Sequence, residues 1–231
     1  MDLLGALRAH RLVAIVRGDD ADAALRTVLT LVEEGVTLVE VSLSGRGALG
    51  VIARARAALG PGAPLGAGTV LSAGDAHAAH AAGADFIVTP AVGDGVAAAK
   101  DLGLPVLAGV MTPTDILSAR RLGADAFKLF PAAQAGGPAY LRALRGPFPD
   151  LPFVPVGGVD AAAARAYLEQ GAVAVGVGSP LIGDAADGGA AGGAALDRLR
   201  RRAGDFLDVV GTATGTAARD DAESFAGEET K

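Results

Sequence analysis

The chain has 231 residues, of which 51% are hydrophobic, and a formal net charge of −6 at pH 7. This length suits one large domain, and the negative charge argues against nucleic acid as the main partner. The absence of cysteine excludes disulfides, thiolate metal sites and cysteine nucleophiles. No apolar run reaches the roughly 18 residues of a membrane span, and residues 1–5 do not resemble a signal peptide. We therefore expect a cytoplasmic protein with no membrane partner.

Short apolar runs alternate with alanine-rich helical patterns after an N-terminal helix over about residues 3–10. Continuous apolar runs are typical of strands that are buried on both faces. Eight such units, without a Gly-x-Gly-x-x-Gly fingerprint after the first strand, favour a single (β/α)8 TIM barrel over a doubly wound open sheet. The expected strands are residues 12–17, 37–43, 64–70, 85–88, 104–108, 124–129, 153–156 and 172–177.

The C-terminal part of the chain differs in composition from the rest. We assign residues 1–210 to the barrel, with the glycine-rich residues 187–193 as a loop before the last helix. After about residue 211 the apolar periodicity ends, and Thr, Gly, Ala, Asp and Glu dominate. A segment that cannot bury apolar surface does not fold by itself, so residues 211–231 are predicted to be a disordered tail.

One lysine lies inside an expected strand, within the apolar segment 125–131. The chain has three lysines, Lys100, Lys128 and Lys231, and only Lys128 has this setting. Burial disfavours the charged ammonium form, and a neutral amine is the nucleophile that attacks a carbonyl to form a Schiff base. Lys128 is therefore a candidate nucleophile. The alternative is a strand-end lysine whose head group reaches solvent.

Two more charged residues are expected near the carboxyl ends of the strands, where barrels carry their chemistry. Arg17 ends the first strand, and Glu40 lies in the second on the same face as Ser42. A carboxylate inside a barrel is costly without a partner, which Lys128 or Arg17 would supply. Glu40 is a candidate general acid and base, or one half of a structural ion pair. Arg17 or the Thr69 hydroxyl would hold the carboxylate of a keto acid.

Glycine loops follow the last two expected strands. Gly157 and Gly158 end the seventh strand, and Gly178 and Ser179 end the eighth. Backbone N–H groups in such turns form anion-binding nests, and barrels frequently bind phosphate at these two loops. The sequence therefore predicts a site for a phosphorylated small molecule.

No metal or other cofactor is expected. His10, His77 and His80 lie before the first strand or on a helix, away from the predicted mouth. Without histidines or clustered carboxylates at the strand ends, a metal-dependent aldolase is disfavoured. Lys128, Glu40 and Arg17 with a phosphate nest instead match a metal-free lysine aldolase that acts on a 2-keto acid.

Seven motifs in order resemble one family, which contains the 2-keto-3-deoxy-6-phosphogluconate, 2-keto-3-deoxy-6-phosphogalactonate and 4-hydroxy-2-oxoglutarate aldolases. Together they span residues 14–179, nearly the whole barrel. The motifs are Ala-Ile-Val-Arg-Gly at 14–18, Val-Glu-Val at 39–41, Gly-Ala-Gly-Thr-Val at 66–70, Val-Thr-Pro at 88–90, Phe-Lys-Leu-Phe-Pro at 127–131, Val-Gly-Gly-Val at 156–159 and Gly-Val-Gly-Ser at 176–179.

The resemblance implies a homotrimeric class I aldolase that reversibly splits a 2-keto-3-deoxy-6-phosphosugar acid into pyruvate and glyceraldehyde 3-phosphate. It implies Lys128 as the Schiff-base lysine and Glu40 as the general acid and base. It also implies two groups of binding residues: Arg17, Thr69, Pro90 and Phe130 for the pyruvate portion, and Gly157, Gly158, Gly178 and Ser179 for the phosphate.

Two positions depart from the gluconate-type pattern. Ser44 stands where those enzymes commonly carry arginine, and Val156 stands where they often carry threonine. Loss of a hydroxyl near the sugar hydroxyls is expected to alter stereochemical preference at C4. Val156 and Ser44 are therefore candidate specificity residues, and both favour the galactonate-type branch.

Two alternatives remain at this point. One is a keto-acid aldolase that needs no phosphate, such as a 4-hydroxy-2-oxoglutarate aldolase. The other is a barrel that binds phosphorylated metabolites without catalysis, because a fold does not establish a function.

Overall fold

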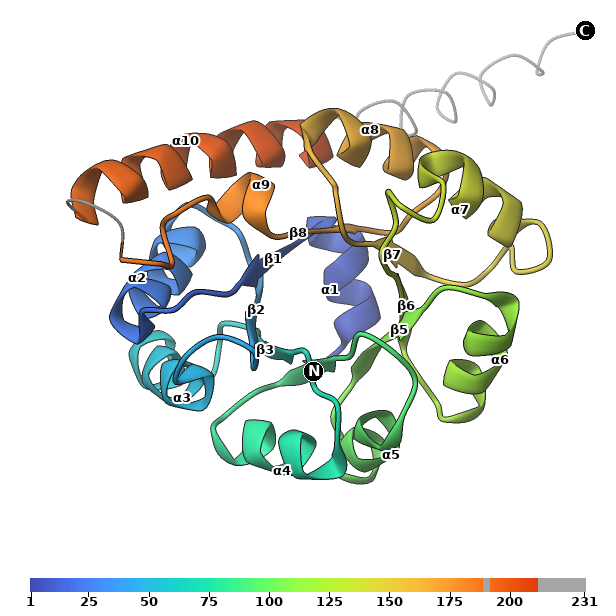
Figure 1. Ribbon diagram of the computed structural model, residues 1–231, viewed down its shortest axis with the longest axis horizontal. Helices are drawn as coiled ribbons and strands as arrows, with labels where there is room; N and C mark the ends of the chain where they lie inside the picture. Colours follow the sequence, from blue (N-terminus) through green and yellow to red (C-terminus); the bar gives the residue numbers. More distant parts are fainter. Residues whose placement is uncertain (189–191, 212–231) are drawn as a thin grey trace, which may run out of the picture.

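The computed structural model describes residues 1–188 and 192–211. Eight strands form one sheet in the order β7-β6-β5-β4-β3-β2-β1-β8, and each neighbouring pair is parallel. One parallel bridge, between Val156 and Gly176, joins the two ends of this order and closes the barrel. Helices surround the strands on all sides (Figure 1). The predicted (β/α)8 fold is confirmed.

The strands are short, between three and five residues. They are β1 (Leu12–Val16), β2 (Leu38–Ser42), β3 (Leu65–Gly68), β4 (Phe86–Val88), β5 (Val106–Val110), β6 (Ala126–Leu129), β7 (Phe153–Pro155) and β8 (Val175–Val177).

Ten helices are described, several with sequence-encoded caps. They are α1 (Leu3–His10), α2 (Ala21–Glu33), α3 (Ala48–Leu59), α4 (Ala73–Ala81), α5 (Asp94–Asp101), α6 (Pro113–Arg121), α7 (Gly137–Arg145), α8 (Ala161–Glu169), α9 (Ser179–Ile182) and α10 (Gly192–Gly211). Ser72 with Asp75 caps α4, and Thr112 with Asp115 caps α6, each as a reciprocal capping box. These caps start the helices directly after the strands and keep the connecting loops short.

Glycine turns return the chain from helix to strand. Four glycines that follow helices and precede Ala or Val have positive φ, which glycine adopts without steric cost. They are Gly35, Gly83, Gly123 and Gly171.

Some boundaries differ from the sequence prediction. The fifth strand runs over Val106–Val110 rather than 104–108, and the eighth begins at Val175 rather than at 172. Both predicted runs are continuously apolar, so no polar residue marks where pairing begins. Gly192, predicted to lie in a loop, begins α10, and Gly211, predicted to begin the tail, ends it. The rest of that tail, 212–231, and loop residues 189–191 lie outside the described residues.

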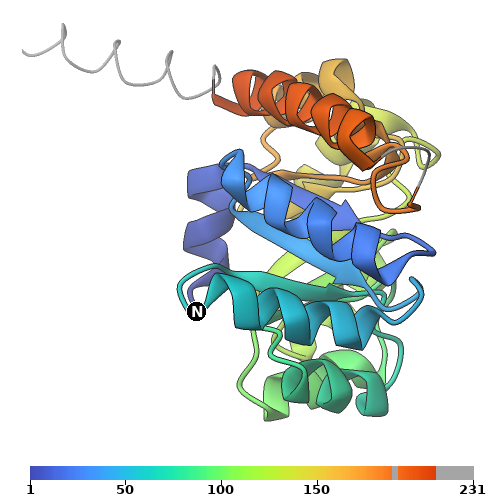
Figure 2. The ribbon, with the colours of Figure 1, turned by 90° about the vertical axis from the view of Figure 1, so that its left-hand side faces the viewer.

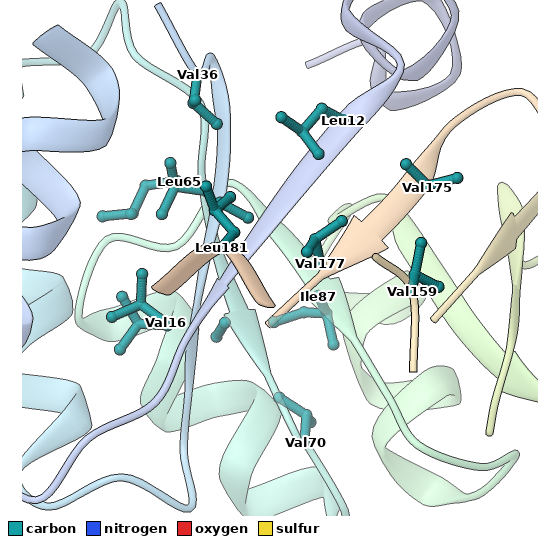
Figure 3. Packing of buried hydrophobic residues seen from close by; sticks show 14 of the residues in the cluster. Leu12, Val16, Val36, Leu65, Val70, Ile87, Val159, Val175, Val177 and Leu181 are labelled. Atoms are coloured by element: carbon teal, nitrogen blue, oxygen red, sulfur yellow. The ribbon is translucent and has the colours of Figure 1, made fainter. Parts of the chain in front are cut away.

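The apolar side chains form two clusters on opposite faces of the strands. The outer cluster lies between strands and surrounding helices, and Figure 3 shows part of it, with Leu12 of β1 and Val175 of β8. The inner cluster fills the barrel with residues such as Leu38 and Phe86. Helix α1 adds Leu7 to the inner cluster and covers the end where the strands begin (Figure 2). The barrel is therefore filled and closed at that end, which leaves the opposite end for a site.

Candidate active site

A cavity of about 760 Å³ opens at the carboxyl ends of the strands. It is lined by residues that lie in or follow β1, β2, β3, β4, β6, β7 and β8. All twelve site residues predicted from the sequence line this one cavity: Arg17, Glu40, Ser44, Thr69, Pro90, Lys128, Phe130, Val156, Gly157, Gly158, Gly178 and Ser179. Residues separated by up to 162 positions in the chain are thus brought together by strand order alone (17 to 179).

Lys128 lies near the end of β6 with its side chain inside the barrel. The residue is only 5% exposed, yet it lines the cavity. Its Nζ lies 5.2 Å from the centre of the Phe130 ring, a distance at which an ammonium group is attracted to an aromatic face. Alternation along the strand places both side chains on the same face. The amine is therefore shielded from bulk water but open to a molecule bound in the cavity.

Glu40 of β2 is the second buried ionisable residue of the cavity, and it is 1% exposed. Burial raises the pKa of its carboxyl, and attraction to the nearby Lys128 charge lowers it by less. Its Oε2 accepts no hydrogen bond from any described residue. A buried carboxyl with a raised pKa and a free oxygen can take up or release a proton during a reaction.

Glycine at position 68 makes room for this carboxyl. A Cβ at Gly68 would collide with the Glu40 carboxylate. The Glu40 carboxylate can therefore lie against β3, next to the point where Gly68 pairs with Ser42 in the ladder. The group that approaches this glycine of the Gly-Ala-Gly-Thr-Val motif is therefore a side chain.

Three hydroxyl groups form a row along the cavity wall. Ser42 Oγ lies 2.8 Å from Ser44 Oγ and 2.7 Å from Thr69 Oγ1, both within hydrogen-bond distance. Thr69 has a φ of 59°, which is rare for a β-branched residue. Ser42 was not among the predicted site residues. Its signal in the sequence was its position on the same strand face as Glu40.

Two glycine loops form the other side of the cavity. Gly157 and Gly158 have φ values of 96° and 69°, so residues with a side chain would be strained there. The backbone N–H groups of Gly157, Gly158, Gly178 and Ser179 donate no hydrogen bond to any residue in the described part of the chain. Four free donors beside a cavity can bind the oxygens of an anion.

The rim carries charged residues of both signs. Arg17 follows β1, is exposed, and forms no ion pair within residues 1–188 and 192–211. Asp19 and Asp187 also line the cavity, and Asp187 Oδ1 accepts a hydrogen bond of 3.2 Å from the Asp19 N–H. Sequence reasoning missed both aspartates, because they lie in loops beyond the strand-end motifs, and only the folded chain shows that these loops meet at the rim.

The other described lysine and the three histidines lie outside the cavity. Lys100 forms a 2.7 Å ion pair with Asp125, outside the cavity, and Lys231 lies outside the described residues. None of the three histidines lines the cavity. Within the described ranges, no group of three or more His, Asp or Glu side chains could hold a metal ion. None of the described helices has the length and hydropathy to cross a bilayer.

Comparison with known proteins agrees with the resemblance drawn from the motifs. A family model described as KDPG and KHG aldolase matches residues 4–188. A 2-dehydro-3-deoxy-phosphogluconate aldolase of Pseudomonas aeruginosa is 39% identical over 162 residues, which are 70% of this chain and 73% of the relative. A 2-dehydro-3-deoxy-6-phosphogalactonate aldolase of Escherichia coli is 34% identical over 172 residues, 74% of this chain and 83% of the relative.

A solved structure of similar fold also contains a reaction intermediate. KDPG aldolase from Legionella pneumophila, with pyruvate captured at low pH as a covalent carbinolamine intermediate, aligns with a TM-score of 0.76 and 26% identity. The alignment covers 89% of this chain and 97% of that one. Since the family model matches most of the chain and relatives above 30% identity span more than two thirds of it, this chain belongs to the KDPG and KHG aldolase family and is an aldehyde-lyase.

Proposed function

We propose that this aldolase reversibly cleaves a 2-keto-3-deoxy-6-phosphosugar acid into pyruvate and glyceraldehyde 3-phosphate, through an imine on Lys128 and without a metal. The observation that carries the proposal is the pair of buried residues, Lys128 and Glu40, in one cavity at the barrel mouth. The carbinolamine in the Legionella pneumophila relative supports covalent chemistry of this kind.

Lys128 supplies the nucleophile. Its neutral amine attacks the C2 keto carbon to give a carbinolamine, which loses water to form a protonated imine. When the C3–C4 bond breaks, its electron pair moves into the imine and leaves an enamine of pyruvate.

Glu40 moves the protons that this cleavage requires. Its carboxylate takes the proton of the C4 hydroxyl as the aldehyde forms, and its carboxyl then returns a proton to C3 of the enamine. Water hydrolyses the resulting imine and releases pyruvate and the free amine. A carboxyl whose pKa is raised by burial suits both roles better than an exposed one, because it holds a proton closer to neutral pH.

The binding residues divide between the two ends of the substrate. Arg17 and the Thr69 hydroxyl hold the keto-acid carboxylate, with Pro90 and Phe130 beside the pyruvate carbons. The phosphate occupies the two glycine loops, where the free N–H groups of Gly157, Gly158, Gly178 and Ser179 support the assignment.

Two residues are proposed to select the epimer at C4. Val156 and Ser44 both line the cavity. Compared with the threonine and arginine of the gluconate-type pattern, they change the space and the hydrogen-bond partners that are available to the sugar hydroxyls. We expect a higher kcat/KM with the galactonate epimer than with the gluconate epimer. The reverse ratio would remove the specificity role of these two residues.

A second substrate, 4-hydroxy-2-oxoglutarate, is favoured by one observation. Asp19 and Asp187 lie on the rim, and their negative charges oppose binding of a phosphate dianion. The description of the family model also includes KHG aldolase. Comparing kcat/KM for a phosphorylated and an unphosphorylated substrate decides between the two, because only the phosphorylated one gains from the glycine loops.

We also propose that the protein acts as a homotrimer in the cytoplasm. Exposed apolar residues after β3 and β5, Leu71 at 63% and Met111 at 38%, support an interface between copies. Light scattering at micromolar concentration tests the trimer, and a mass of one chain would contradict it. Cell fractionation tests the location.

Borohydride trapping with pyruvate tests the chemistry directly. Reduction of the imine is expected to add one pyruvyl group to Lys128, located by peptide mass spectrometry. Lys100→Arg is the matched control, because Lys100 is already held in an ion pair with Asp125. No adduct in the wild type, or an adduct on Lys100, would overturn the proposal and favour a barrel that binds metabolites without catalysis.

A further inference from the structure

We propose that Ser42 is a positioning residue: in the Ser44–Ser42–Thr69 hydroxyl row it donates to Thr69 Oγ1 and so holds the Thr69 hydroxyl with its proton toward the carboxylate of the keto acid. This inference rests on the proposed function, because it assumes a carboxylate beside Thr69. The mechanism proposed above gives Ser42 no role, and here Ser42 and Ser44 orient the Thr69 hydroxyl.

The row of three hydroxyl groups has one proton left for a bound molecule. Three hydroxyl groups carry three protons, and the two internal hydrogen bonds of 2.8 and 2.7 Å use two of them. Either atom of each pair can be the donor, so the row by itself has no fixed direction. One proton remains for a molecule in the cavity, because all three residues line it.

A bound carboxylate sets the direction. An ionised carboxylate only accepts hydrogen bonds, so Thr69 must donate its single proton to it. Thr69 can then only accept from Ser42, and Ser42 in turn accepts from Ser44. The order becomes Ser44 to Ser42 to Thr69 to carboxylate, and each bond polarises the next one.

Ser42 is the residue that holds the Thr69 hydroxyl in place, because it is central in the row and buried. It is 2% exposed, whereas Ser44 is exposed and can exchange its partner for water. Its ladder partner is Gly68, the residue immediately before Thr69, so the two hydroxyls are held across adjacent strands. The φ of 59° at Thr69 shows a backbone held in a strained conformation, as is common at binding sites.

The test is a double-mutant cycle read out by pyruvate affinity. The pyruvate concentration that gives half-maximal borohydride trapping on Lys128 is measured for the wild type, Ser42→Ala, Thr69→Val and the double variant. Ser42→Ala is expected to raise this concentration about two- to tenfold, the range for one net hydrogen bond. The double variant is expected to match Thr69→Val alone, because Ser42 acts through the Thr69 hydroxyl.

Two further variants separate positioning from a structural effect. Ser42→Thr keeps the hydroxyl and is expected to restore wild-type affinity. Thr69→Val keeps the β-branched shape, so it leaves the backbone strain at position 69 in place. Ser44→Ala is expected to weaken pyruvate binding less than Ser42→Ala does, because water can replace an exposed hydroxyl.

Additive effects in the cycle would overturn the inference, as would unchanged pyruvate affinity in Ser42→Ala. A change confined to the aldehyde partner would mean that the row points outward through Ser44, and would also overturn it. Failure of the proposed function itself is distinguishable, since the wild type would then show no pyruvyl adduct on Lys128 at all.

Discussion

The two ends of the barrel are built from the same strands but do different work. On β2, Leu38 lies in the inner apolar cluster, and Glu40, two residues further, lines the cavity. On β6, Ala126 belongs to that cluster, and Lys128 again follows two residues later. Side chains two apart share one face of a strand. On both strands, therefore, a residue that stabilises the fold and a residue that carries the chemistry are only two positions apart.

The largest effect expected at the mouth comes from Lys128→Met. Methionine keeps a long apolar stem in the same space but has no amine, so turnover is expected to fall below detection with little change in thermal stability. Steady-state kinetics measures the turnover, and thermal unfolding followed by circular dichroism measures the stability. Residual activity within tenfold of wild type would remove Lys128 from the mechanism.

Glu40→Gln is expected to reduce kcat by about 10²- to 10⁴-fold, the usual span for a proton-transfer residue. Glutamine has nearly the same shape, so trapping of pyruvate on Lys128 should persist while cleavage slows. Single-turnover kinetics with a complete substrate separates these steps. An unchanged kcat would mean that another group moves the proton.

Gly68→Ala tests whether the position of Glu40 matters as much as its presence. The added Cβ would collide with the Glu40 carboxylate and displace it, with an expected loss of roughly 10²-fold in kcat. Gly50→Ala on α3 is the matched control, because a Cβ there meets nothing within 4 Å. Equal kinetics in the two variants would contradict the role assigned to the close approach.

At the end of the barrel that α1 covers, a substitution is expected to lower stability and leave catalysis nearly unchanged. Leu7→Ala on α1 removes a fully buried side chain from the inner cluster and should cost about 2–5 kcal/mol of unfolding free energy. The kinetic constants of the folded variant should stay within about twofold of wild type, since no cavity residue is touched. Denaturant unfolding and steady-state assays check both. A large fall in kcat at full folding would show that the two ends are coupled.

The smallest effect concerns the pH dependence of stability. Burial raises the pKa of folded Glu40 above its usual 4.5, so between 4.5 and the raised value the folded chain holds a proton that the unfolded chain releases. Stability from this residue is therefore present below pH 4.5 and lost as pH rises. The difference in Tm between Glu40→Gln and wild type should grow from pH 4 towards pH 8. A constant difference would contradict a raised pKa.

The sequence predicted the site residues at the strand ends better than those in the loops around the cavity. Motifs at strand ends identify Lys128, Glu40 and the glycine loops, because a parallel barrel brings all strand ends to one face. Strand boundaries were less certain, as at Val106 and Val175, because strands buried on both faces are uniformly apolar.

The residues that sequence reasoning missed depend on contacts rather than on order. Asp187 reaches the rim from a segment after α9, and only the folded chain places it beside Asp19. Ser42 was visible as a neighbour of Glu40 on one strand face, but serine is common and its role follows only from two distances. Local pattern specifies which face a residue occupies, and tertiary contacts specify its partner.

The closure between β7 and β8 has a consequence for local opening of the barrel. Four residue pairs join β1 to β2. Between β7 and the segment of β8 there is one bridge, Val156 with Gly176, and a hydrogen bond from the Val173 N–H to the Phe153 carbonyl. Val156 and Gly176 both line the cavity. A seam with so few hydrogen bonds should open locally far more often than the whole domain unfolds. Amide hydrogen exchange should therefore be faster along this seam than along the other strand pairs, and should slow when the cavity is occupied, which would make the seam an internal reporter of occupancy.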